Sequence, residues 1–227
     1  GSTASDGTAE SDLSGTSVVT YNGIGDMAGG QIWYSDTAAT PEEDEEFLVV
    51  GDVFDNMDGL SRRDRFRYDS PDFSGFSVSG SAVEDDAFDL AARYSRKYDD
   101  AGIKVATSVG WADGGDLKSY EDQLSGSLSI LHETTGLNLT LSAGQQNYDD
   151  QEDPFYWYGK IGYQAKLLSI GKSSFSIDYG QFDDVDSDGD EAETFSIAFV
   201  QKVDDWSSEL YIAWRQHMLD TADTDYD

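Results

Sequence analysis

The chain contains no cysteine, and only 3 prolines and 2 histidines occur among its 227 residues. Without cysteine there can be no disulfide scaffold, no cysteine-ligated zinc and no cysteine nucleophile. A Ser-His-Asp site would depend on His132 or His217, and no G-x-S-x-G nucleophile motif accompanies either of them. Paired carboxylates occur throughout so acidic a chain, so their spacing identifies no catalytic pair. We therefore expect that the protein is not an enzyme.

Basic residues are also scarce, with 14 Lys and Arg against 46 Asp and Glu, which gives a formal net charge of −32. A polyanion would be repelled from most of such a surface, so nucleic-acid binding is excluded. The acidity suits a salty or divalent-rich setting, or the conduction of cations.

Long apolar runs are missing as well. No stretch of 18 apolar residues occurs, so we expect no transmembrane helix, and no signal peptide is visible. Low hydropathy usually indicates a soluble protein. Membrane β-barrels escape that test, because their strands alternate polar and apolar residues and the average looks hydrophilic.

What the sequence does contain, from about residue 74, is apolar residues at every second position. Leu124, Leu128 and Ile130 alternate with serines, for example, which gives a strand one apolar and one polar face. With residues 62–68 included, we count ten strands of roughly 7–14 residues, close to the ~9–11 that a tilted strand needs to cross a bilayer. The apolar positions of the ten segments fall in 62–68, 76–82, 88–94, 103–111, 124–130, 137–141, 155–163, 175–179, 195–199 and 210–214.

The connections between these segments alternate in length. Short turns are expected at 70–72, 98–101, 133–136, 169–172 and 204–205, and mostly longer, acidic loops at 84–86, 113–118, 148–153 and 182–193. Such an asymmetry is typical of outer-membrane barrels, as are aromatic residues near strand ends. The aromatic residues in question are Trp111, Tyr148, Phe155, Trp157, Phe182 and Trp206.

A soluble β-sandwich or barrel is the plainer alternative, because its strands also alternate. Two observations count against it. The polar face is rich in Ser, Gly, Gln and Lys, as a water-filled lumen would be. The alternation also continues through ten consecutive hairpin-linked segments, which suits an up-and-down barrel. We therefore predict an all-β, transmembrane, antiparallel up-and-down barrel.

Four arginines lie close together at one point of this acidic chain: Arg62, Arg63, Arg65 and Arg67. In a strand, Arg63, Arg65 and Arg67 share one face. Charges on a lipid-exposed face cost roughly 2–4 kcal/mol each near the midplane, so these three arginines are expected to face the lumen. The alternative is an arginine cluster that binds loop carboxylates and has no role in transport.

The segment "SRRDRFRYDSPDFSGFSVSG" (61–80) resembles a region of general Gram-negative porins in which an arginine-bearing strand runs into a Tyr-x-Ser-Pro turn and a Gly-Phe strand. "GSTASDGTAESDLSGTSVV" (1–19) resembles the start of the long third loop of that family, which folds into the barrel. The likeness continues in order along the whole chain.

The resemblance implies a protein of the bacterial outer membrane, a trimer of 16-stranded barrels that passes small hydrophilic solutes. Residues 1–61 would form the constriction loop, and residues 62–227 would form barrel strands with short periplasmic turns and acidic outer loops. Residues 62–68 would be the sixth strand, so the first five strands and the last one would be missing from this chain. The implied partners are lipid and lipopolysaccharide, together with two further copies of the chain.

The same resemblance places loop carboxylates opposite Arg63, Arg65 and Arg67. The candidates are Asp6, Glu10 and Asp12, with Asp26 as a further one. A positive wall that faces a negative loop creates a transverse field in a narrow passage, which favours polar solutes. The net charge of −32 adds the hypothesis of mild cation selectivity. Other lumen-facing charges are interpreted mainly as lumen solvation: Arg93, Lys97, Lys104, Lys160, Lys166 and Arg215.

The acidic loop "DDVDSDGDEAE" (183–193) carries Asp184, Asp186 and Asp188 at the D-x-D-x-D-G spacing of a calcium loop. Its twelfth position is Phe195, where an EF-hand needs a bidentate glutamate, so an EF-hand is rejected. A loose divalent cation site, with Ca²⁺ as the natural ion, stays open as an alternative, and no cofactor is required.

These observations favour a porin for passive diffusion. The second hypothesis is an outer-membrane barrel that acts in adhesion or ligand binding through its acidic loops, and the third is a soluble acidic β-protein.

Overall fold

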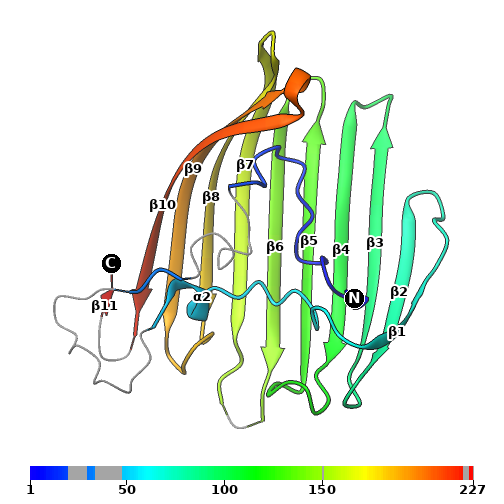
Figure 1. Cartoon of the computed structure of the whole chain (residues 1–227), viewed down its shortest axis with the longest axis vertical. Coiled ribbons are helices and arrows are strands. Elements are labelled where there is room, and N and C mark those ends of the chain that lie inside the picture. Colours follow the sequence, from blue (N-terminus) through cyan, green and yellow to red (C-terminus); the bar gives the residue numbers. More distant parts are fainter. Residues whose placement is uncertain (20–29, 34–47, 150, 222–224, 227) are drawn as a thin grey trace.

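The computed structural model describes residues 1–19, 30–33, 48–149, 151–221 and 225–226. In these residues the architecture is a single curved antiparallel sheet (Figure 1). Its elements in chain order are α2 (Val50–Val53), β1 (Arg65–Asp69), β2 (Phe76–Val83), β3 (Phe88–Tyr98), β4 (Ile103–Asp113), β5 (Asp122–His132), β6 (Leu137–Asn147), β7 (Phe155–Leu168), β8 (Gly171–Asp183), β9 (Glu191–Val203), η1 (Asp204–Trp206), β10 (Ser208–Asp220) and β11 (Asp225–Tyr226).

Each strand pairs with its neighbours in sequence, so the order across the sheet is β1 to β11 without a crossover. The prediction of ten up-and-down strands is confirmed by β1 to β10, and the two-residue β11 adds a short pair at the end of β10. Short turns gather at one end of the sheet and longer loops at the other, as Figure 1 shows. Among the described residues, β1 and β11 do not pair, so the sheet is open there.

The two faces of the sheet reverse the usual distribution of polar and apolar residues. In β6, the residues Leu137, Leu139 and Leu141 are exposed, whereas Asn138 and Thr140 between them are buried. Large apolar side chains are exposed in the same way on every strand from β1 to β10. Water would penalise such an apolar surface, whereas lipid would not. We call this apolar surface the outer face and the buried polar one the inner face.

The first strand begins three residues later than expected, at Arg65 rather than at position 62. The preceding residues pair with the start of the chain instead of with β2. Ser2 forms a bridge with Arg62, and the amide of Arg63 donates to the carbonyl of Gly1 at 3.1 Å. Ser61, with φ of 64°, turns the chain into this arrangement. Arg62 and Arg63 therefore lie before the strand, and the strand begins at Arg65.

Two segments cross the inner face, as Figure 1 shows: residues 1–19, which we call the outbound segment, and residues 48–64, the return segment. The return segment packs its one aromatic side chain, Phe54, on the wall. The ring of Phe54 meets that of Phe182 edge-to-face at 4.9 Å, and Phe182 stacks on Tyr156 at 5.2 Å. Phe182 therefore lies near a strand end as expected, but it is fully buried on the inner side and does not belong to an aromatic girdle at the membrane interface.

No helix in the described residues is long and apolar enough to cross a membrane.

The outer face predicts a depth-dependent cost for charge. Ile161, in the middle of β7, is 67% exposed, and Phe73 is 62% exposed in the turn between β1 and β2. Replacing Ile161 with Lys is expected to lower the free energy of unfolding from lipid vesicles by about 2–4 kcal/mol, and the control Phe73→Lys by about 1 kcal/mol or less. Urea titrations measure both. Equal costs at the two positions would contradict a lipid-facing surface.

Candidate functional site

The outbound segment lies on the inner face because hydroxyl groups of the strands satisfy its backbone. The carbonyl of Thr8 accepts hydrogen bonds from Ser108 at 2.8 Å and from Ser127 at 2.6 Å. Further bonds of 2.9 Å run from Ser142 Oγ to the carbonyl of Ala9, from the amide of Ser11 to Ser127, and from the amide of Leu13 to Ser129. A segment without regular structure is thus satisfied by side chains where it is buried.

Two arginines and one aspartate hold the beginning of this segment. Arg67 Nη1 donates to the carbonyls of Ser2 and Thr3 at 3.2 and 2.6 Å. Arg93 Nη2 donates to the carbonyls of Ala4 and Asp6 at 2.7 and 2.8 Å. On β3, the fully buried Asp89 accepts the amides of Ala4 and Ser5. These bonds fix the backbone of residues 2–6, and this anchoring does not depend on any contact between the arginines and solutes.

A buried ion pair holds the middle of the segment. Lys160 Nζ lies 2.6 Å from Asp12 Oδ2, and the two side chains are 0% and 7% exposed. Thr140 Oγ1 lies at 3.4 Å from the other carboxylate oxygen. At this low exposure the two charges depend on one another, because either of them alone would carry a large desolvation cost.

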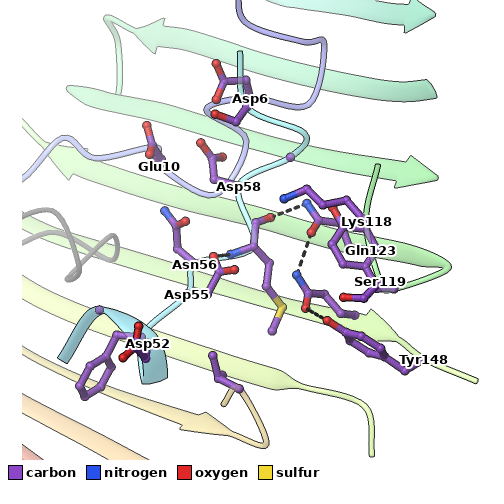
Figure 2. A pocket seen from close by; sticks show the side chains of 18 of the residues that line it. Asp6, Glu10, Asp52, Asp55, Asn56, Asp58, Lys118, Ser119, Gln123 and Tyr148 are labelled. Carbon is purple, nitrogen blue, oxygen red and sulfur yellow. Dashed lines mark hydrogen bonds between the residues drawn. The ribbon is translucent and has the colours of Figure 1, made fainter. Parts of the chain in front are cut away.

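Between the two segments lies a cavity of about 680 Å³ at the long-loop end of the sheet. Figure 2 shows Asp6, Glu10 and Asp58 on one side, with Lys118, Ser119 and Tyr148 from the outer loops across from them. Asp52, Asp55 and Arg62 also line the cavity. Its walls are thus strongly acidic, with Arg62 and Lys118 as the basic residues among those that line it.

Two carboxyl groups join the outbound and return segments here. Asp58 accepts the amides of Gly7 and Ala9 at 2.8 and 3.2 Å. Burial and the charges of Asp58 and Asp6 raise the pKa of Glu10 to about 7. Burial also raises the pKa of Asp58, whereas its bonds to the two amides oppose that shift. With a pKa of about 7, Glu10 is protonated below neutral pH, where its proton can be shared with Asp58, and it ionises as the pH rises through 7.

The three predicted pore arginines contact different parts of the chain. Arg63 lies near the carbonyl of Leu60, and the guanidinium of Arg65 lies against Gly1. Arg67 pairs with Asp69 at 2.7 Å besides binding the backbone. In the described part of the chain, no hydrogen bond or ion pair joins these three arginines to the side chains of the predicted carboxylates Asp6, Glu10 and Asp12. Their facing one another across a passage stays a prediction.

Sequence reasoning missed two residues that matter here, Asp58 and Asp89, and the binding partners of two others. Arg93 and Lys160 were placed on the inner face by strand alternation, but their partners could not be read from the spacing, because they lie 87 and 148 positions away. Asp58 and Asp89 were not distinguished from 44 other acidic residues. Only their burial and their bonds to backbone amides distinguish them.

The acidic loop between β8 and β9 uses carboxylates to fold itself. Asp184 Oδ1 accepts the amide of Gly189 at 2.7 Å, and Asp190 Oδ2 accepts that of Asp186 at 3.1 Å. Asp188 accepts the amide of Glu152 from the neighbouring loop. Within the described residues, no three acidic or histidine side chains come together as metal ligands. The calcium alternative at Asp184, Asp186 and Asp188 stays untested.

The inverted sheet, its lipid-compatible outer face and the segments folded against its inner face define the class: the wall of a membrane-spanning β-barrel with an inward loop. A family model of Gram-negative porins matches residues 2–214, and the chain belongs to that family. Its location is therefore the bacterial outer membrane, and the family indicates a channel rather than an enzyme. No curated protein gives a significant match to the chain.

The pair of Lys160 and Asp12 predicts strong energetic coupling. Lys160→Met leaves the carboxylate of Asp12 buried and unpaired, so the free energy of unfolding should fall by roughly 3–5 kcal/mol. The double variant Lys160→Met with Asp12→Leu should recover most of that loss, because no charge stays buried. Denaturant unfolding of the wild type, the two single variants Lys160→Met and Asp12→Leu, and the double variant measures the coupling. Additive losses would show that the two residues act independently.

The Glu10 and Asp58 pair predicts that stability falls as pH rises. The raised pKa of about 7 for Glu10, against an ordinary 4.5, means that the folded protein holds the proton more tightly. This contribution is complete below about pH 4.5 and is lost as the pH rises through 7. Glu10→Gln should flatten that part of a plot of melting temperature against pH. An unchanged slope in the variant would contradict the shared proton.

Proposed function

We propose that this porin wall guides small hydrophilic solutes and ions past the outbound and return segments by passive diffusion, with a mild preference for cations. One observation carries the proposal: the cavity between the outbound and return segments is lined by Asp6, Glu10, Asp52, Asp55 and Asp58 rather than filled as a closed apolar core. Water and ions tolerate such a surface, whereas apolar solutes lose hydration without a compensating contact.

The charges of this cavity support the cation preference. Carboxylates outnumber the basic groups Arg62 and Lys118 along its walls, and in a narrow passage charges are weakly screened. Asp12 does not add to this field in the same way, because Lys160 neutralises it against the wall. The acids expected to matter are therefore those of the cavity, which Arg62 lines and Arg67 does not.

The test is the reversal potential of single channels in a planar bilayer under a KCl gradient at pH 8, where Glu10 is ionised. We expect cation preference in the wild type. Asp6→Asn with Glu10→Gln should reduce the ratio of K⁺ to Cl⁻ permeability at least about twofold, which corresponds to about 0.4 kcal/mol.

The control for this test is Asp72→Asn, in a short turn at the opposite end of the sheet, which should leave the ratio unchanged. Anion preference in the wild type, or an equal effect of the control, would overturn the proposed selectivity. Insertion without conductance would overturn the channel itself.

A further inference from the structure

A basic residue stands on the apolar outer face of β3. Arg96 shares the outer face with Leu90 and Tyr98, and it is exposed. Its guanidinium carbon lies 5.3 Å from the centre of the Tyr98 ring. In the described residues Arg96 has no ion pair, although other basic groups of the sheet have one, such as Lys97 with Glu133 and Arg215 with Asp178.

The position of Arg96 limits what can neutralise it. It lies two residues from the end of β3, at the short-turn end, where an arginine on a barrel exterior costs little because it reaches the membrane interface. In an outer membrane, lipid headgroups as well as water would surround it there. A guanidinium in that position binds phosphate oxygens in a bidentate manner.

The neighbouring tyrosines offer a second donor. The hydroxyls of Tyr94 and Tyr98 hydrogen bond to one another. One of the two protons is used in that bond, so the other hydroxyl proton stays available to an acceptor beside Arg96. An anion with several oxygens could therefore bind both the guanidinium and a phenol.

A separate hollow lies farther along the outer face, toward the middle of the sheet. It measures about 480 Å³, and it is lined by Tyr68, Val78, Ser79, Gly80, Leu90, Ala91, Ala92, Val109 and Trp111. The surface is hollowed here because Gly80, Ala92 and Val78 have small side chains and lie on adjacent strands, where Val78 pairs with Ala92. Ala92 precedes Arg96 by four residues, or about 13 Å along a strand. An acyl chain of a phospholipid whose phosphate is bound at Arg96 would reach the hollow at this depth.

We propose that the outer face of β1 to β4 holds one phospholipid, with its phosphate on Arg96 and the Tyr94–Tyr98 pair and one acyl chain in the hollow beside Trp111. The proposal rests on the proposed function only in that the outer face meets a membrane. Charge complementarity selects the occupant, because an uncharged apolar partner would leave Arg96 without a counter-ion.

The test is native mass spectrometry of the refolded, delipidated protein, titrated in detergent with dioleoylphosphatidylglycerol. We expect one retained lipid per chain. Arg96→Gln and the hollow-filling Ala92→Leu should each weaken retention about tenfold, the effect of about 1.4 kcal/mol. Two matched controls should retain the lipid as the wild type does: Lys202→Gln at the same end of the sheet, and Ala143→Leu on the outer face of β6.

Two further arms identify the chemistry. Dioleoylglycerol lacks the phosphate and should bind at least about tenfold more weakly than the phospholipid. Millimolar inorganic phosphate should not displace the lipid, because it cannot fill the hollow. Effective competition by inorganic phosphate would show a free-anion site and overturn the lipid assignment, as would unchanged retention in Arg96→Gln.

The alternative occupant of the hollow is a second copy of the chain. If Ala92→Leu dissociates an oligomer in sedimentation experiments while lipid retention stays unchanged, the hollow is a contact between copies and the proposal falls. Conductance of the wild type and of each variant is recorded in parallel. Wild-type channels that conduct normally without retaining lipid contradict this proposal alone, whereas silent wild-type protein contradicts the proposed function.

Discussion

Hydrogen bonds between strand hydroxyls and the backbone of the outbound segment are the interaction on which the rest of the structure depends. A buried segment without regular structure needs partners for its amides and carbonyls, and Ser108, Ser127, Ser129 and Ser142 supply them. The same need explains why the inner face is polar. Once the inner face is polar, the apolar residues of each strand must lie on the outer face, where only lipid accommodates them.

Charge is distributed according to this arrangement. Basic side chains act mainly as anchors on the inner face: Arg67 and Arg93 bind loop carbonyls, and Lys160 neutralises Asp12. Carboxylates that are free of such partners gather instead in the cavity and in the outer loops. Arg67 and Arg93 thus hold the loop in place, whereas under the proposed function the carboxylates of the cavity set the field that an ion meets. Asp58 takes part in both, because it also accepts two backbone amides of the outbound segment.

The strands could be predicted from the sequence because alternation with a period of two depends only on the local backbone. Leu137, Leu139 and Leu141 lie outward as expected, and the connections alternate between short turns and mostly longer loops as expected. The prediction failed at Arg62 and at Phe182, where a distant segment decides the outcome: Gly1 and Ser2 pair with the residues before β1, and Phe54 packs on Phe182. Partners such as Asp12 for Lys160 depend on tertiary contacts that spacing does not encode.

The central claim is that the outbound segment lies on the inner wall in the conducting protein. Ser11 Oγ and Ser108 Oγ are 3.0 Å apart, and the chain contains no cysteine, so Ser11→Cys with Ser108→Cys creates a single defined pair. Conductance is measured in planar bilayers before and after oxidation. The account predicts that the disulfide forms and that conductance is unchanged. Failure to cross-link, or a channel that changes its conductance when the disulfide forms, would contradict it.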